Sequence, residues 1–191
     1  MPARTRITKQ LAITFGIIFF GIIIARAIAP ETTPSYNLSN SVVLSSDGIA
    51  INTELTGQQL PKVDLTTLTG EKISTQTLTG APIIINIWYS TCEPCRRELP
   101  VLASAAAQYL DQVRFVGVNI KDSASVAKEF AAQYGVEFEL LLDTNGQFIS
   151  KLGIATAPVT LTVDAQGVII DQVAGEISAR KLDELVKELL K

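Results

Sequence analysis

The stretch STCEPCRRE, residues 90–98, contains both cysteines of this 191-residue chain, Cys92 and Cys95. It follows PIIINIWY (82–89), an unbroken apolar segment with the length and composition of a strand covered on both faces. The pattern then becomes helical over 93–110. A close pair of cysteines at the junction of a buried strand and a helix is the feature that decides the fold.

The segments around this junction predict an α/β domain. KVDLTTLTGEKISTQTL (62–78) alternates apolar and polar residues around Thr69-Gly70 and predicts an N-terminal β-hairpin. Residues 138–143 are either a short strand or an edge segment. We expect a strand at 113–120, helices at 123–135 and around 146–152, two strands within 158–175, and a final helix at 178–191. This order of elements predicts a central mixed β-sheet with helices on both faces.

An almost wholly apolar run occupies residues 11–29, with Arg26 as its one charge. A helix of this length spans about 28 Å, close to the hydrocarbon thickness of a bilayer. Arg4, Arg6 and Lys9 precede the run without an acidic residue, and positive charge on this side keeps the N-terminus in the cytoplasm. The pattern predicts a single-pass protein of the cell membrane, with everything after the helix outside the cytoplasm.

A cleaved signal peptide has the same basic start and apolar run. ARA at 25–27 and AIA at 27–29 both have the small residues of a cleavage site. Pro30 disfavours cleavage after the second, so cleavage after the first stays open. Both alternatives place the domain outside the cytoplasm. A lipoprotein is excluded because no cysteine follows the apolar run to carry the lipid.

Composition divides the chain into three parts. Residues 1–30 are a cytoplasmic tip and transmembrane anchor or signal segment, 31–57 a flexible linker rich in Ser, Thr, Asn and Gly, and 58–191 the α/β domain. The first part carries four basic and no acidic side chains, so the remainder has twelve basic and nineteen acidic ones, a net charge of −7. This acidic balance argues against binding to nucleic acid.

Two cysteines and no histidine restrict the chemistry of the site. A zinc site needs about four ligands, mostly Cys or His, and a c-type haem site needs histidine where Arg96 stands. We therefore expect no metal and no cofactor, and Cys–His nucleophilic catalysis is excluded. A structural disulfide between cysteines so close would constrain the unfolded chain little. It stays as the alternative to redox exchange.

Redox exchange fits the position of the pair better. A cysteine at a helix N-terminus feels the positive end of the helix dipole, which lowers the pKa of its thiol. We expect Cys92, before the first turn, to be exposed and to attack, and Cys95 to be shielded and to resolve the mixed disulfide. Pro94 lies in the first turn, where a missing N–H costs nothing. Arg96 and Arg97 would add positive potential.

Four segments resemble the thioredoxin fold, and more closely the membrane-tethered extracytoplasmic reductases of the TlpA/ResA type. They are LPKVDLTTLTGEKIS (60–74), NIWYSTCEPCRRELP (86–100), GVEFELLLDTNGQ (135–147) and IATAPVTLTVDAQGVI (154–169). The resemblance covers residues 58–191. It implies a thioredoxin-like α/β domain with a redox-active disulfide.

The resemblance implies two further catalytic residues besides the cysteines. Pro158 matches the cis-proline of the family, which lies against the CxxC motif and leaves the backbone of Ala157 free to pair with a bound peptide. Glu98, three residues after Cys95, matches a partly buried glutamate of the cytochrome c-maturation members. There a carboxyl group of raised pKa moves protons to and from the thiols. The alternative for Glu98 is a solvated helix residue.

Other positions match the family in less specific ways. Glu93, inside the motif, is expected to be exposed and to tune the potential or the choice of partner. Asn86 occupies the position of a buried acid in thioredoxin itself, so that role would pass to Glu98. Trp88 matches a packing position. Relatives usually have tryptophan before the first cysteine, where this chain has Thr91, and this departure puts the identity of the partner in doubt.

The sequence thus predicts an extracytoplasmic thiol–disulfide oxidoreductase that reduces protein disulfides. Its expected partners are disulfide-bearing clients such as apocytochrome c in cytochrome c biogenesis, a membrane thiol donor of electrons, and the membrane itself. The alternatives are an oxidant or isomerase in the folding of secreted proteins and a non-catalytic tethered module. A peroxidase is disfavoured because Tyr89, not threonine, lies three residues before Cys92.

Overall fold

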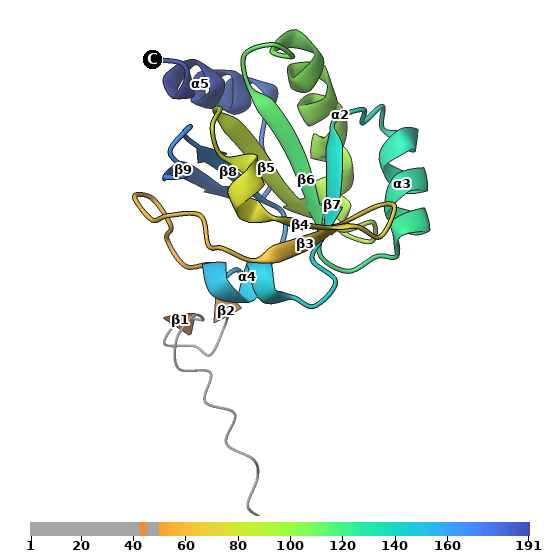
Figure 1. Ribbon diagram of the computed structural model, residues 1–191. Coiled ribbons are helices and arrows are strands. Elements are labelled where there is room, and N and C mark those ends of the chain that lie inside the picture. Colours follow the sequence, from red (N-terminus) through yellow and green to blue (C-terminus); the bar gives the residue numbers. More distant parts are fainter. Residues whose placement is uncertain (1–42, 45–49) are drawn as a thin grey trace, which may run out of the picture. The chain divides into compact units, whose positions relative to one another are not determined.

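The computed structural model describes residues 43–44 and 50–191, and their main feature is a seven-stranded mixed sheet with order β4-β3-β7-β6-β5-β8-β9 (Figure 1). Its strands are β3 (Asp64–Thr67), β4 (Lys72–Ser74), β5 (Ile83–Trp88), β6 (Arg114–Asn119), β7 (Glu139–Leu142), β8 (Val159–Val163) and β9 (Ile169–Ala174). The helices are η1 (Thr75–Leu78), α2 (Glu93–Gln108), α3 (Ala124–Gln133), α4 (Gln147–Leu152) and α5 (Ala179–Leu189). Strands β1 (Val43–Leu44) and β2 (Ala50–Ile51) form a separate two-stranded antiparallel sheet.

The thioredoxin-like α/β fold predicted from the sequence is confirmed. The segment left open at 138–143 contains β7, an internal strand that pairs parallel to β6 and antiparallel to β3. The edges of the sheet are instead β4, from the predicted N-terminal hairpin, and β9. The predicted membrane segment, 1–30, lies outside the described residues. Among those described, no helix combines the length and the apolar character needed to cross a bilayer.

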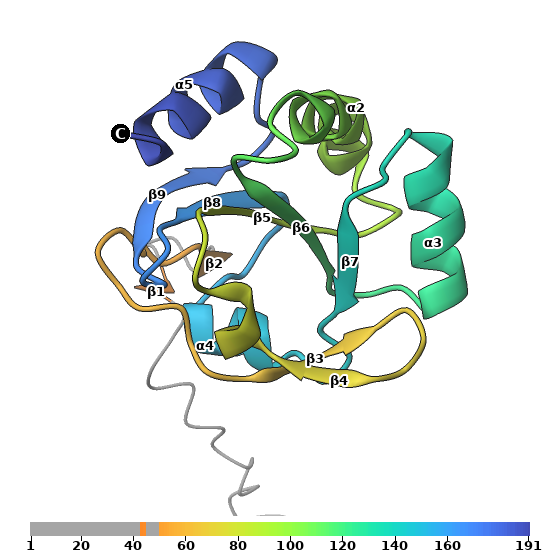
Figure 2. The same cartoon turned by 45° about the horizontal axis from the view of Figure 1, so that its top comes forward.

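Strand β5 is the centre of the sheet, and all six of its side chains are buried. Its odd-numbered isoleucines share a core with Phe148 of α4. On the other face, Ile84 packs with side chains of α2 and α5, and Trp88 packs with side chains of α2 and α3. Figure 2 shows α2, α3 and α5 around one side of the sheet and α4 on the other. Because β5 is covered on both faces, the loop that follows it starts from a rigid base.

The domain begins earlier than the predicted boundary at residue 58. Leu55 is 2% exposed and packs in the main core, although it lies in the predicted linker, 31–57. Its N–H donates to the side-chain oxygen of Gln172, whose amide donates to the carbonyl of Thr53. A single buried leucine among polar residues gives no periodic signal, and this is why the sequence reads as a linker here.

Gly117 on β6 leaves space for the ring of Trp88, which β5 places beside α2. A Cβ atom at Gly117 would lie 2.8 Å from Leu140 Cδ2 and 3.0 Å from Trp88 Nε1, closer than van der Waals contact allows. Trp88 is fully buried and stacks on Phe130 of α3, with ring centroids 5.9 Å apart. The predicted packing role of Trp88 agrees with this arrangement.

Candidate active site

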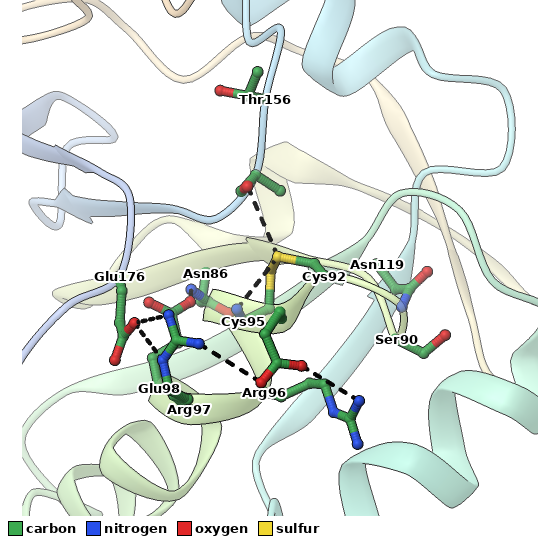
Figure 3. The surroundings of a disulfide bond; sticks show 12 residues. Asn86, Ser90, Cys92, Cys95, Arg96, Arg97, Glu98, Asn119, Thr156 and Glu176 are labelled. Carbon is green, nitrogen blue, oxygen red and sulfur yellow. Dashed lines mark hydrogen bonds and ion pairs between the residues drawn. A yellow bond between two sulfur atoms is a disulfide. The ribbon is translucent and has the colours of Figure 1, made fainter.

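The two cysteines form a disulfide at the start of α2 (Figure 3). Cys92 is the N-cap of the helix, with extended backbone angles, and its Sγ accepts a hydrogen bond from the N–H of Cys95 at 3.2 Å. Pro94 occupies the first turn, where helices leave N–H groups unpaired. After reduction the same N–H and the helix dipole both favour a thiolate on Cys92.

The two cysteines differ less in solvent exposure than the sequence predicts. Cys95 is fully buried, as expected, but Cys92 is only 4% exposed. The difference arises because the loop before β8 lies across it: the carbonyl oxygen of Ala157 is 3.7 Å from Cys92 Sγ. Cys92 remains the outer of the two sulfurs. A client disulfide therefore has to approach along this loop.

The loop against the disulfide contains the predicted cis-proline. The Ala157–Pro158 peptide bond is cis, as the resemblance implies. Pro158 is buried, whereas Ala157 is half-buried. Among the described residues, the N–H of Ala157 makes no hydrogen bond to the backbone or to a side chain. The main chain beside Cys92 therefore has an unused donor for a partner.

Glu98 lies one helical turn after Cys95 and is completely buried. Its Oε1 accepts a hydrogen bond from Asn86 Nδ2 at 2.7 Å, and its Oε2 accepts one from the N–H of Ile177 at 3.0 Å. The pKa of Glu98 is raised to about 7, mainly by burial and slightly by the nearby charge of Glu176, against the opposing effect of these two hydrogen bonds. The solvated alternative for Glu98 does not agree with this burial.

Asn86 completes the buried polar cluster. Its Nδ2 also donates to Thr160 Oγ1 of β8 at 3.2 Å, whereas its Oδ1 is buried without a partner among the described residues. A half-turn of this amide exchanges the positions of oxygen and nitrogen. The oxygen would then face Glu98 and accept a hydrogen bond from its protonated form. Asn86 can therefore pair with Glu98 in either protonation state.

The charged residues at the rim of the site neutralise one another. Glu93 pairs with Arg96 at 3.4 Å and with Arg97 at 3.6 Å, and Arg97 also bonds Glu176 at 2.6 Å (Figure 3). These side chains are exposed, as predicted for Glu93, so each pair contributes little to stability. The positive potential expected from the two arginines is compensated at close range. Stabilisation of a thiolate thus depends mainly on the start of the helix.

Two polar residues that sequence reasoning missed support the loops on either side of the disulfide. Asp122 accepts hydrogen bonds from the N–H and the hydroxyl of Ser90, both at 2.7 Å, and from Asn119 Nδ2 at 2.8 Å. Partial burial raises the pKa of Asp122, but these hydrogen bonds outweigh it and leave the pKa below its usual value. The second residue is Asn52, which bonds Ala155 and Thr156. Neither residue lies in a motif that would have singled it out.

A groove in the domain lies away from the disulfide. This groove of about 360 Å³ is lined by Ala81, Leu110 and Phe138, at the end of β5 and β6 opposite to the cysteines. Neither cysteine lines it. At the disulfide the main chain of Ala157 lies beside Cys92 Sγ, an arrangement that suits a macromolecular client bringing its own disulfide to the surface.

The buried acid predicts a pH-dependent stability. Glu98 keeps its proton in the folded state up to about pH 7, whereas in the unfolded chain its pKa is 4.5, the ordinary value of a glutamate. The stability gained from neutral Glu98 is therefore complete below pH 4.5 and is lost as the pH rises through 7, by about 3 kcal/mol. We expect urea unfolding of the oxidised protein to show this decline and Glu98→Gln to remove most of it.

Glu93→Gln, in the same helix but at an exposed position, is the matched control and should keep the decline. The chain has no histidine, so no side chain of ordinary pKa titrates in the upper part of this interval, between about pH 6 and 7. A decline of equal size in Glu98→Gln would show that the carboxyl group is not the cause.

Comparisons with known proteins agree with this geometry. Residues 56–172 match the AhpC/TSA family. The thiol-disulfide oxidoreductase ResA of Bacillus subtilis (strain 168) is 28% identical over 144 residues, which cover 75% of this chain and 78% of ResA. The structure of MTB dsbF, in its mixed oxidized and reduced forms, has 32% sequence identity to this chain and a TM-score of 0.61. The match covers 66% of this chain and 94% of the dsbF chain.

A third similar protein is a secreted disulfide oxidoreductase of Mycobacterium tuberculosis that is homologous to E. coli DsbE. It has 25% identity and a TM-score of 0.59, and the match covers 66% of this chain and 96% of that one. The family match includes both cysteines, Glu98 and Pro158. This chain therefore belongs to the AhpC/TSA family, as a thioredoxin-like thiol–disulfide oxidoreductase of the ResA/DsbE type.

Proposed function

We propose that this protein is a reductant of protein disulfides outside the cytoplasm, and that its client is the CxxCH pair of apocytochrome c or a carrier that acts on it. The observation that carries the proposal is the buried Glu98, whose pKa of about 7 places a proton donor and acceptor one turn from Cys95. Similarity to ResA and to a homologue of DsbE supports it.

The reaction begins with the thiolate of Cys92, which attacks one sulfur of the client disulfide. A mixed disulfide forms, and the first client sulfur leaves as a thiolate that takes up a proton. Cys95 then loses its proton and attacks Cys92 Sγ, which releases the second client sulfur as a thiolate, and this thiolate also takes up a proton from the solvent. The client gains two electrons and two protons, and the enzyme becomes the Cys92–Cys95 disulfide seen in the structure.

Glu98 handles a proton in the second half of this sequence. Cys95 is fully buried, so water has little access to its thiol. The ionised carboxylate of Glu98, which lies on the same face of α2, can accept the Cys95 proton when the mixed disulfide is resolved. The neutral acid can return a proton when the enzyme is reduced again. A pKa near 7 suits both directions at neutral pH.

The cellular setting in this proposal comes from the sequence of the first thirty residues. An uncleaved apolar helix preceded by basic residues would hold the domain at the outer face of the membrane. There a membrane thiol donor can reach the disulfide and restore the dithiol. A soluble oxidant or isomerase for secreted proteins is the second candidate, and the reduction potential separates the two.

The first test is the reduction potential of the full chain, measured by equilibration with a thiol–disulfide buffer of known composition. A reductase needs a dithiol that loses electrons readily, so we expect a value near or below about −250 mV. A value near about −120 mV, which is typical of a strong oxidant, would contradict the proposal and favour a role in forming disulfides.

The order of attack and the client are tested together by trapping. Reduced Cys95→Ser should accumulate a mixed disulfide on Cys92 with a peptide that contains an oxidised CxxCH motif, because no second thiol resolves it. Cys92→Ser should trap little, since Cys95 is fully buried. Gel shifts without reductant and mass spectrometry measure both.

A peptide with the same disulfide loop but alanine in place of the histidine is the matched control for the client. Equal trapping by the two serine variants refutes the order of attack. Equal rates with the two peptides refute the cytochrome client and leave the reductase unaffected.

The proposed topology makes a separate prediction. A reporter that is active only outside the cytoplasm, fused after Lys191, should be active, and the protein should remain with the membranes after a carbonate wash. Membrane retention follows from the apolar run of residues 11–29. A soluble product that begins near Ile28 would instead show a cleaved signal, and an inactive reporter would refute the extracytoplasmic location.

A further inference from the structure

Asn52 connects the start of the domain to the loop that covers the disulfide. Its side-chain Oδ1 accepts hydrogen bonds from the N–H of Ala155 at 2.7 Å and from the N–H of Thr156 at 2.9 Å. Its Nδ2 donates to the carbonyl oxygen of Thr156 at 3.2 Å. One amide thus binds the main chain of two consecutive residues, and it uses both its acceptor and its donor.

The bound loop has little other support. Ala155 and Thr156 are exposed, and every hydrogen bond that they make to the described residues goes to Asn52. The neighbouring Thr53 N–H donates to the carbonyl of Gly153 at 3.0 Å, at the end of α4. The segment 52–53 therefore holds the loop between α4 and β8 from outside. Without Asn52, water would replace these contacts and the loop would be free to move.

The next residue of the same loop is the one that faces the reactive sulfur. Ala157 follows Thr156 directly, and its carbonyl oxygen lies 3.7 Å from Cys92 Sγ. Figure 3 shows Thr156 on the chain segment that passes over the disulfide. A displacement of Thr156 would therefore move the main chain that lines the approach to Cys92.

A client joined to Cys92 has to pass this main chain. The two Cα atoms of a disulfide lie about 5.5 Å apart, so the backbone around the client cysteine comes close to Ala157. The N–H of Ala157, which is unpaired within the described part of the chain, can then pair with the client backbone, as extended peptides do at exposed main-chain edges. The position of Ala157 thus affects how a peptide docks.

We propose that Asn52 is a positioning residue for polypeptide clients: it fixes the main chain at Thr156 so that Ala157 is presented to the backbone of the client beside Cys92. It acts through the loop and does not touch the reacting sulfurs. Small disulfides have no peptide backbone to align, so their reduction does not depend on Asn52.

Two substitutions separate the parts of this contact. Asn52→Ala removes the acceptor and the donor together, and the released N–H groups are exposed enough to bind water, so the fold should tolerate it. Asn52→Asp keeps an oxygen for the two N–H groups but replaces the donor with an acceptor, which repels the carbonyl of Thr156. Its effect should lie between those of wild type and Asn52→Ala.

Glu54 provides the matched control in the same segment. Its carboxylate also accepts hydrogen bonds from two consecutive N–H groups, those of Leu55 and Thr56, at 3.1 and 3.0 Å. These contacts are local and do not reach the loop before β8. Glu54→Ala therefore removes the same kind of contact without releasing Thr156.

The experiment compares the reduction of insulin with the reduction of a small aromatic disulfide by each variant of the full chain. For Asn52→Ala we expect the KM for insulin to rise about ten-fold with kcat nearly unchanged, since misplaced binding groups weaken docking and leave the chemistry intact. The rate with the small disulfide and the reduction potential should equal those of wild type. Glu54→Ala should match wild type with both substrates.

Three outcomes would overturn the proposal. Asn52→Ala with unchanged kinetics on insulin would show that the contact is only structural. An equal loss of rate with both disulfides, or a shifted reduction potential, would show that the residue acts on the cysteines or on the fold. Thermal unfolding detects a folding defect in Asn52→Ala. If Asn52→Ala does have a folding defect, Asn52→Asp is the deciding variant. A wild-type KM for insulin in Asn52→Asp would contradict the role of the Nδ2 donor of Asn52.

Discussion

The burial of the Glu98 carboxyl group is the constraint on which the site depends. Its two oxygens join α2 to β5 through Asn86 and to the segment after β9 through Ile177. An ionised carboxylate is costly to bury, so the burial that accompanies these contacts raises its pKa to about 7 although the hydrogen bonds themselves oppose the rise. The Glu98 carboxyl group is therefore both a structural contact and a group that can hold a proton near neutral pH. In a chain without histidine, no other side-chain type titrates near neutral pH unless its environment shifts it.

The electrostatics of the thiols follow from the backbone more than from the neighbouring charges. Arg96 and Arg97 would stabilise a thiolate if they were free, but Glu93 and Glu176 pair with them at the surface. The N–H of Cys95 and the first turn of α2 remain as the groups directed at Cys92 Sγ. Such groups are fixed by the fold, and because Cys92 is buried, salt screens their effect on it less than it screens the exposed ion pairs.

The strongly apolar segments and the cysteine motif made the fold and the centre of the site predictable from the sequence. Glu98 and Pro158 were both found because the resemblance implies them, and for Glu98 the spacing of three residues also places it on the helix face of Cys95. Asn52 and Asp122 were not found. Their partners lie 103 and 32 residues away, and a polar residue in a loop has no periodicity that would reveal such contacts. The burial of Cys92 was misjudged for the same reason, because a distant loop covers it.

The two kinds of support around the disulfide serve different properties. Glu98 and Asn86 lie in the core, where in the proposed mechanism Glu98 exchanges protons with the thiols and where a substitution disturbs packing. Asp122 and Asn52 hold exposed or partly exposed loops on either side of Cys92, where main-chain positions can change without rebuilding the sheet. Thr91, in place of the tryptophan usual in relatives, is exposed on the same surface. Client choice can therefore diverge through these loops and Thr91, while the redox chemistry stays fixed by the buried side of the site.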